Sequence, residues 1–162
     1  TDKAAQITGV YGATKYIVEE LFAQYEKANP ETLYRVVRYG NVLYSTGSVL
    51  CKWRKLITEG KEVIITDPAA TRFFWTVDEA VNLIFECLEN ATTAAPYCPD
   101  MKSMTMGDLL EAMIQKYSPG DRPNVKVIGL QEGENLHEKI LAEGPSSADT
   151  AKFTIEEIKK LI

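Results

Sequence analysis

The chain is poor in cysteine and has no long hydrophobic run, and both absences exclude classes of protein. Its 162 residues include three cysteines, Cys51, Cys87 and Cys98, an odd number at wide spacing. Zinc sites and secreted disulfide frameworks need closely paired cysteines, so we interpret all three as reduced, buried thiols. No apolar run approaches the ~20 residues that cross a bilayer, and no signal segment opens the chain. We therefore expect a cytoplasmic protein with no membrane segment in this chain.

Positively charged residues are outnumbered by negatively charged ones. The formal net charge is −5, with 18 Lys and Arg residues scattered among 23 Asp and Glu residues. Proteins that bind nucleic acid gather Lys and Arg into a stripe, so this pattern argues against a nucleic-acid partner. The one histidine, His137, offers too few ligands for a histidine metal site or a Ser-His pair. We expect no metal site and a packing role for His137.

Hydrophobic residues that recur at helical spacing alternate with short β-branched and aromatic segments. Capping boxes at Thr76/Glu79 and Thr154/Glu157 open two of the helical segments. The predicted helices cover about residues 10–28, 48–59, 76–88, 105–117 and 154–162. The predicted strands cover residues 33–39, 63–65 and 125–128. The third helix is expected to bury Val77, Val81, Ile84, Phe85 and Leu88.

The alternation of helices and strands indicates an α/β layer architecture with mostly parallel strands. The composition, 45% hydrophobic and 25% charged, is typical of one soluble globular domain or of part of one. Residues 142–149 are rich in Gly, Pro and Ser and form the one segment with linker composition. We predict that this segment is a mobile loop.

Tyr11 and Lys15 are four residues apart at the start of the first helix, so their side chains share one face. A tyrosine with an ordinary pKa of about 10 is a poor base at neutral pH, and a nearby ammonium favours the phenolate. Short-chain dehydrogenases use this pairing. A lone Tyr-x-x-x-Lys also arises by chance in amphipathic helices, where a solvated Lys lies beside a half-buried Tyr. The pair therefore needs support from other motifs.

Further segments in the chain supply that support, in a fixed order. The first group is Thr1-Asp2-Lys3-Ala4-Ala5, Tyr11-Gly12-Ala13-Thr14-Lys15, Val37-Arg38-Tyr39-Gly40-Asn41-Val42 and Gly47-Ser48-Val49. The second group is Thr71-Arg72-Phe73 with Asp78-Glu79-Ala80, and Gly133-Glu134 with Leu136-His137-Glu138. Together they resemble the inverting UDP-N-acetylglucosamine 4,6-dehydratases, extended short-chain dehydrogenases of bacterial polysaccharide and glycan biosynthesis. The resemblance covers essentially the whole chain.

The resemblance implies the carboxy-terminal part of an NAD(P)-binding Rossmann-type fold. Residues 1–66 would form the end of the Rossmann sheet with the catalytic helix, and residues 67–162 mainly the substrate-binding subdomain, within one partial domain. No Gly-x-Gly-x-x-Gly follows a strand in the chain, and the acidic ribose-binding residue of the dinucleotide fold is also missing. We therefore expect roughly 120 to 130 further residues upstream, and we expect this chain alone to be inactive.

The resemblance also implies a division of catalytic work. Tyr11 would remove the proton from the sugar 4-hydroxyl while hydride passes from C4 to NADP, or NAD, which makes a 4-ketone. Lys3 would take the acidified C5 proton, and Asp2 would protonate the departing 6-hydroxyl before hydride returns to C6. Elimination across adjacent carbons needs a base and an acid close together. Lys3 must be neutral to act as a base, which requires a pKa below its ordinary value of about 10.4.

Other residues match the family's cofactor and sugar positions, each with a simpler structural alternative. Lys15 would bind the nicotinamide ribose, and Tyr39 would line the nicotinamide. The alternative for Lys15 is a surface lysine, and the alternative for Tyr39 is a core aromatic residue at a strand end. Asn41 would approach the sugar and phosphates of the substrate, unless it is a turn residue bonded to its own backbone.

The remaining matches concern the nucleotide. Arg72 would grip the diphosphate with its planar fork, although an exposed arginine looks the same in the sequence. Glu134 would accept hydrogen bonds from the uridine ribose, or would be a glutamate at a helix start. Ser48 and Val49 would contact the substrate where free backbone N–H groups suit an anion. The alternative for Ser48 is a helix cap.

Some positions depart from the family pattern. Family members usually carry Arg-Pro-Gly-Glu-Lys before Leu-His-Glu, where this chain has residues 131–135, Gln-Glu-Gly-Glu-Asn. In the family's Gly-Ser-Arg-Gly-Ser segment, Tyr44 fills a glycine position and Thr46 replaces the arginine. These losses motivate a second hypothesis, a non-catalytic module that binds a nucleotide sugar.

A third hypothesis is a nucleotide-sugar 4-epimerase. The pair Asp2-Lys3 argues against it, because epimerisation at C4 needs no acid and base at C5 and C6. Under every hypothesis the expected ligand is a UDP-sugar. The parent enzyme is expected to be a homo-oligomer.

Overall fold

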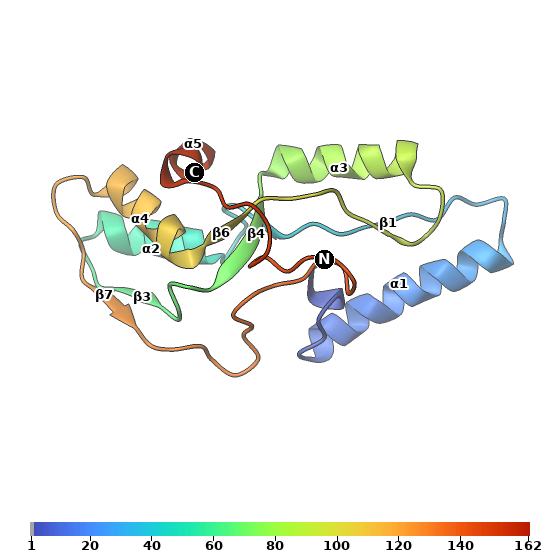
Figure 1. Ribbon diagram of the computed structural model, residues 1–162, viewed down its shortest axis with the longest axis horizontal. Coiled ribbons are helices and arrows are strands. Elements are labelled where there is room, and N and C mark those ends of the chain that lie inside the picture. Colours follow the sequence, from blue (N-terminus) through green and yellow to red (C-terminus); the bar gives the residue numbers. More distant parts are fainter. Residues whose placement is uncertain (1) are drawn as a thin grey trace.

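The chain forms an elongated molecule in which helices flank short strands (Figure 1). The computed structural model describes residues 2–162, apart from the side chain of Asp2. The helices are the 3₁₀ helix η1 (Asp2–Ala4) and α1 (Val10–Ala28), α2 (Val49–Thr58), α3 (Val77–Asn90), α4 (Met106–Tyr117) and α5 (Ile155–Leu161). The strands are β1 (Val36–Val37), β2 (Asn41–Val42), β3 (Val63–Ile65), β4 (Thr71–Trp75), β5 (Pro96–Tyr97), β6 (Ser103–Thr105) and β7 (Val125–Val127). Each α-helix lies where the hydrophobic spacing predicts one.

Most strand pairs among the described residues are parallel. β1 pairs with β5, β2 with β4 and β3 with β7 in parallel register, while β6 runs antiparallel to β4. The predicted α/β architecture with mostly parallel strands is thus confirmed. Within the predicted strand at residues 33–39, only Val36–Val37 pairs. The unpredicted strands β2, β5 and β6 have two or three residues, too few for alternation of polar and apolar residues to reveal them. β4 has five residues, but its sequence Thr-Arg-Phe-Phe-Trp does not alternate.

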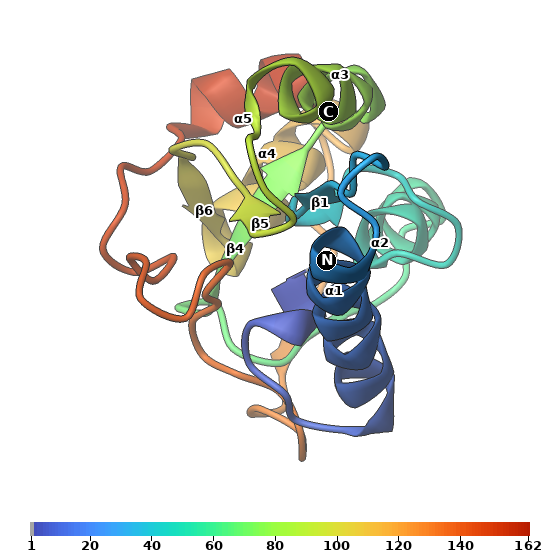
Figure 2. The ribbon, with the colours of Figure 1, turned by 90° about the vertical axis from the view of Figure 1, so that its right-hand side faces the viewer.

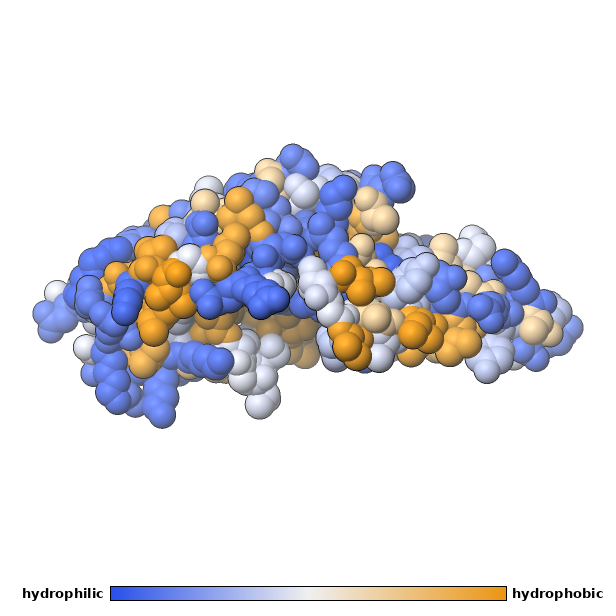
Figure 3. Space-filling view, turned by 90° about the horizontal axis from the view of Figure 1, so that it is seen from below, coloured by the Kyte–Doolittle hydropathy of each residue, from blue (hydrophilic) through white to orange (hydrophobic). Residues whose placement is uncertain are grey.

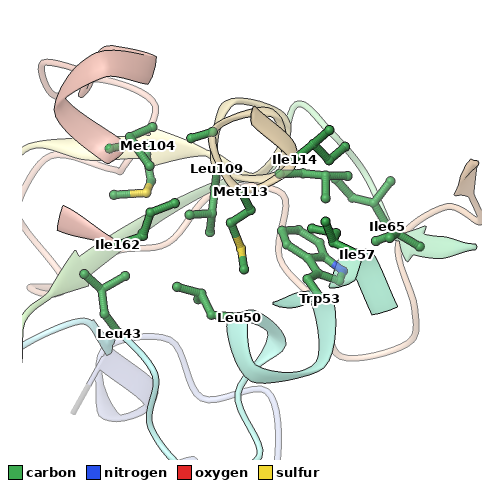
Figure 4. Packing of buried hydrophobic residues seen from close by; sticks show 14 of the residues in the cluster. Leu43, Leu50, Trp53, Ile57, Ile65, Met104, Leu109, Met113, Ile114 and Ile162 are labelled. Atoms are coloured by element: carbon green, nitrogen blue, oxygen red, sulfur yellow. The ribbon is translucent and has the colours of Figure 1, made fainter. Parts of the chain in front are cut away.

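The main hydrophobic core lies between α2, α4 and α5 and the strands beside them (Figure 4). On α2, Leu50, Trp53 and Ile57 recur at helical spacing and are at most 3% exposed. They pack with Leu109 and Met113 of α4, which are fully buried. This core joins the middle of the chain to its last helix, and its described members include none from α1.

Helix α3 has apolar residues on two sides, which makes one prediction wrong. Its capping box forms as expected, since Thr76 Oγ1 accepts from the Glu79 N–H at 3.1 Å and the Glu79 carboxylate accepts from the Thr76 N–H at 2.7 Å. The buried residues, however, are Ala80, Leu83 and Cys87. The face predicted to be buried is 40–59% exposed. Helical spacing identifies an apolar face, but it cannot decide which of two such faces lies against the core.

Helix α1 also presents apolar side chains to solvent, and hydrophobic atoms gather along it in Figure 3. The exposed apolar residues are Val10, Tyr11, Tyr16, Ile17, Val18, Leu21, Phe22 and Tyr25. Polar contacts hold the helix instead: Glu19 accepts from Arg38 Nε at 3.0 Å, and Glu26 accepts from the Ala94 N–H at 3.0 Å. α1 and α3 lie on opposite sides of the β1–β5 pair (Figures 1 and 2).

Residues 142–149 are anchored to the sheet, in contrast to the mobile loop that their composition suggests. Ser147 is fully buried within this segment. Its carbonyl accepts from Ser103 Oγ at 2.7 Å, and its own Oγ lies 2.6 Å from Thr71 Oγ1. Composition predicts an irregular segment but not the partners of a buried serine, which come from β4 and β6.

The capping box of α5 makes stability depend on pH. The Glu157 carboxylate accepts from Lys102 Nζ at 2.8 Å and from the Thr154 N–H at 2.8 Å. The Lys102 hydrogen bond, followed by those from Thr154, lowers the pKa of Glu157 from 4.5 to about 2. Because the pKa is lower in the folded state, this contribution to stability is fully present above pH 4.5 and is lost as the pH falls through about 2.

Glu157→Gln is therefore expected to lower the midpoint of thermal unfolding near neutral pH, and to have a shrinking effect as the pH falls into the acid range. Melting curves of the wild-type and variant proteins across this range measure the difference. A difference that stays constant down to acid pH would contradict the assignment of the pH dependence to Glu157.

Candidate functional site

Two neighbouring parallel strands carry the first candidate side chains. β2 begins with Asn41, whose partner Phe74 lies two residues after Arg72 on β4. Gly40 permits the close approach of the strands, because a Cβ atom there would lie 2.4 Å from the Phe73 carbonyl oxygen. Asn41 Nδ2 donates to the same carbonyl at 3.2 Å. The strand pairing thus brings Asn41 beside Arg72.

The start of α1 lies against Lys3. A Cβ atom on Gly12 would lie 2.5 Å from the Lys3 carbonyl oxygen, so this contact requires glycine. On α1, Lys15 Nζ lies over the Tyr11 ring, 5.3 Å from its centroid, in the position of a cation–π contact. The two side chains therefore share one face, as their spacing predicts. Tyr11 is 63% exposed, and its role as a base stays a prediction.

Two hollows adjoin Asn41 and Arg72, and neither of them is lined by Tyr11 or Lys15. The larger, of about 400 Å³, lies against α2 and includes Ser48 and Val49 in its wall. The smaller, of about 260 Å³, includes Lys3 and Glu138. Three residues line both hollows: Asn41, Arg72 and Glu134. The folded chain thus gathers all five sequence-predicted substrate residues around two adjoining spaces.

Arg72 is held in place by contacts along its guanidinium group. Its side chain is 15% exposed, and Nη1 donates to the carbonyls of Thr71 at 2.8 Å and Leu136 at 3.1 Å. Nε lies 3.2 Å from Glu138 Oε1. The alternative of an exposed, unconstrained arginine is therefore wrong. A planar, permanently charged group that borders both hollows suits a diphosphate.

Glu138 belongs to the site although its sequence pattern did not single it out. Its side chain is 8% exposed and accepts from Lys3 Nζ at 3.4 Å and from Asn41 Nδ2 at 3.1 Å. Its one signal in the sequence is its place in the segment Leu136-His137-Glu138. A carboxylate beside a lysine favours the charged form of that lysine, whereas a lysine that acts as a base must be neutral. Proton removal by Lys3 therefore requires this ion pair to open.

The structure bears on the structural alternatives for Ser48 and Glu134, while their contacts with a substrate stay predictions. Ser48 is at the N-cap position of α2, but its hydroxyl makes no capping hydrogen bond and donates to Cys51 Sγ at 3.6 Å. The first backbone N–H groups of α2, from Val49 on, thus have no side-chain cap beside the larger hollow, where such groups suit an anion. The Glu134 N–H closes a turn to the Gln131 carbonyl at 3.0 Å, and no helix begins there. The helix-start alternative for Glu134 is wrong.

Other sequence-predicted residues keep their assignments as predictions. The side chain of Asp2 lies outside the described residues. Tyr39 is half-buried between β1 and β2, and its contact with a nicotinamide stays a prediction. His137 Nδ1 lies 2.8 Å from Thr71 Oγ1, a structural hydrogen bond. Among the side chains that the structure describes, no three His, Cys, Asp or Glu residues group as metal ligands, and no described helix has the length and hydropathy to cross a bilayer.

Tyr44 has a structural role at the position where the family carries glycine. Its φ of 56° lies in the left-handed region that favours glycine. Its hydroxyl lies 2.7 Å from the Tyr117 hydroxyl and 3.4 Å from the Ile162 carbonyl. Burial, followed by the hydrogen bond with Tyr117, raises the pKa of Tyr44. Tyr44 therefore keeps its hydroxyl proton. Through this hydroxyl it links the segment before α2 to α4 and to the end of α5.

The three cysteines are free thiols, as predicted, but only Cys87 is fully buried. Burial raises the pKa of Cys98 to about 11. The thiolate is the reactive form of cysteine, so Cys98 is a poor nucleophile at neutral pH.

The comparison with known proteins indicates the same family as the motifs that supply the site residues. The family model described as polysaccharide biosynthesis protein matches residues 1–160. The UDP-N-acetylglucosamine 4,6-dehydratase (inverting) of Campylobacter jejuni is 37% identical over 159 residues, which cover 96% of this chain and 44% of that protein. A UDP-glucose 4-epimerase of Rickettsia canadensis is 33% identical over 155 residues, which cover 94% of this chain and 43% of that protein.

Solved structures agree with these relatives. Pen from Bacillus thuringiensis superimposes with a TM-score of 0.86 and 28% identity, over 99% of this chain and 58% of its own. The chain spans 44% and 43% of the two curated relatives described above, which is less than half of their length. The resemblance read from the sequence motifs is confirmed. The chain belongs to the polysaccharide biosynthesis protein family and forms part of an α/β fold of the short-chain dehydrogenase type.

Proposed function

We propose that this chain is the substrate-binding part of an inverting nucleotide-sugar 4,6-dehydratase, a lyase that acts on UDP-N-acetylglucosamine or a close relative. One observation carries the proposal: Lys3, Asn41 and Arg72 line the same small hollow, although they come from three separate segments. In a nucleotide sugar the diphosphate is bonded to the sugar that reacts, so a base and an anion-binding arginine must lie close together. The similarity to the Campylobacter dehydratase supports the same reaction.

In this enzyme the catalytic groups come from η1 and the start of α1. Tyr11 removes the proton of the 4-hydroxyl, and Lys3 removes the C5 proton once the neighbouring ketone has acidified it. Asp2 donates a proton to the departing 6-hydroxyl. The close approach of Gly12 to the Lys3 carbonyl supports this grouping, because it brings the start of α1 next to η1. Substrate binding opens the pair between Lys3 and Glu138, which frees Lys3 to lose its proton.

The nucleotide occupies the larger hollow and the sugar the smaller one. Arg72 binds the diphosphate, because it borders both spaces. The uncapped N–H groups of α2, from Val49 on, bind phosphate oxygens beside Ser48, and Glu134 accepts hydrogen bonds from the uridine ribose. Asn41 contacts the sugar where the hollows adjoin.

The chain's own residues fit only the nicotinamide end of a dinucleotide cofactor. Lys15 would bind the nicotinamide ribose, and Tyr39 would line the nicotinamide ring. No glycine-rich turn for the pyrophosphate occurs in the chain. NADP, or NAD, would supply the capacity to take up a hydride from C4 and to return one at C6.

The exposed apolar sides of α1 and α3 support the proposal of a further, dinucleotide-binding half. These helices flank β1, which pairs with β5 and with no other described strand. Parallel strands of α/β proteins are covered on both faces by helices. The further half would add strands beside β1 and cover both helices. We further propose that the complete enzyme is a cytoplasmic homo-oligomer and that the 162-residue chain alone is inactive.

Turnover of UDP-N-acetylglucosamine in the presence of NADP tests the proposal. The full-length protein is expected to form a 4-keto-6-deoxy product that is lighter by one water. The 162-residue chain alone is expected to form none. Turnover by this chain alone would contradict its dependence on a cofactor-binding half.

A 4-epimerase is the second candidate function, because the chain is 33% identical to a UDP-glucose 4-epimerase. Epimerisation would use Tyr11 and Lys15 but would need no base at C5. Mass analysis of the product separates the two reactions, since an epimer keeps the 6-hydroxyl. A third candidate, a non-catalytic module, would bind the UDP-sugar in calorimetry without NADP and would show no turnover in the full-length protein.

A further inference from the structure

Glu138 joins three segments that are distant in the sequence. Its Oε1 lies 3.4 Å from Lys3 Nζ and 3.2 Å from Arg72 Nε, and its Oε2 accepts from Asn41 Nδ2 at 3.1 Å. Lys3 precedes it by 135 residues and Asn41 by 97. The carboxylate is 8% exposed, and a charge so buried is tolerated only with such partners.

A network of buried hydroxyl groups holds the backbone of Glu138. Ser147 Oγ accepts from the Glu138 N–H at 2.8 Å and donates to the Thr71 carbonyl at 3.0 Å. Thr71 directly precedes Arg72 on β4, and its Oγ1 also lies 2.8 Å from His137 Nδ1. The carboxylate is thus placed relative to the same strand that carries Arg72.

We propose that Glu138 is a positioning residue whose carboxylate holds Lys3 and Arg72 at set places on the wall of the smaller hollow. The assignment rests on the proposed function. Without the carboxylate the two cations would repel each other, and Asn41 would lose an acceptor for its amide. Glu138 acts through these side chains: it orients Arg72 toward the diphosphate, and it holds Lys3 beside the reacting sugar until substrate binding opens their ion pair.

Glu138→Gln in the full-length protein tests the assignment. Three donors of the described residues converge on the carboxylate, whereas a carboxamide offers one oxygen and an NH₂ group that must face a donor. The KM for UDP-N-acetylglucosamine is expected to rise about 10- to 100-fold, and the affinity for UDP in calorimetry to weaken in parallel. The value of kcat is expected to fall as well. Glu138→Asp restores the charge at shorter reach and is expected to recover part of kcat and of UDP affinity.

Glu111→Gln is the matched control, because Glu111 pairs with Arg122 at 2.6 Å and lines neither hollow. It is expected to leave KM and kcat unchanged. Wild-type KM and kcat in Glu138→Gln would overturn the assignment. So would a loss that follows a lower melting temperature and is not recovered by Glu138→Asp, since that pattern marks a structural role. A wild-type protein that neither binds UDP nor converts the sugar nucleotide would refute the proposed function, and this assignment with it.

Discussion

Lys3→Met in the full-length protein is expected to lower kcat for dehydration by about 10²- to 10⁴-fold. Methionine keeps a long, flexible side chain but has no amine to take the C5 proton. Substrate deuterated at C5 reports this step directly, because the wild-type enzyme releases the deuterium to water and the variant is expected to retain it. Release of deuterium at the wild-type rate would contradict the assignment of Lys3 as the base.

Lys3→Arg separates the role of base from that of charge partner. Arginine keeps the positive charge that pairs with Glu138, but it cannot lose its proton in a protein. We expect this variant to be as inactive as Lys3→Met, with a melting temperature close to that of the wild type. A kcat near the wild-type value would show that Lys3 serves only as a cation.

Trp53→Ala is expected to lower the free energy of unfolding by about 3–5 kcal/mol. Trp53 is 3% exposed between α2 and α4 (Figure 4), and its Nε1 donates to the Ile64 carbonyl at 2.9 Å. Alanine would leave a cavity in the core and would break the hydrogen bond that ties α2 to β3. Urea unfolding followed by circular dichroism measures the change.

Trp75→Ala is the matched control for the core variant. Trp75 is only partly buried at the end of β4, and its Nε1 lies 2.9 Å from Met101 Sδ. The loss of stability is expected to be clearly smaller than for Trp53→Ala, because less apolar surface returns to water. Equal losses would contradict the placement of the main core between α2 and α4.

The positions of the helices could be predicted from the sequence, but the side that each helix buries could not always be predicted. The Thr76/Glu79 box and the apolar spacing after it place α3 correctly. The same helix carries apolar residues on both sides, so spacing selected the exposed side instead of Ala80, Leu83 and Cys87. The short strands were missed because their pairing depends on partners far along the chain.

The candidate site was predictable where residues occur in motifs and unpredictable where they act through distant partners. Motifs singled out Lys3, Asn41 and Arg72, which share one hollow. Glu138 and Ser147 gave little signal, because a buried carboxylate or serine is recognised by what it contacts. Their partners lie on other segments, so no local pattern reports them.

The sequence by itself determined the helices, the capping boxes of α3 and α5, and the residue types that chemistry at this site requires. Capping hydrogen bonds and helical spacing act within about four residues, and a local pattern therefore contains them. Only the tertiary structure decided that Lys3 and Glu138 form an ion pair across 135 residues, and that α1 leaves its apolar side exposed. Such contacts depend on which surfaces are buried together when the whole chain folds, so no short stretch of sequence specifies them.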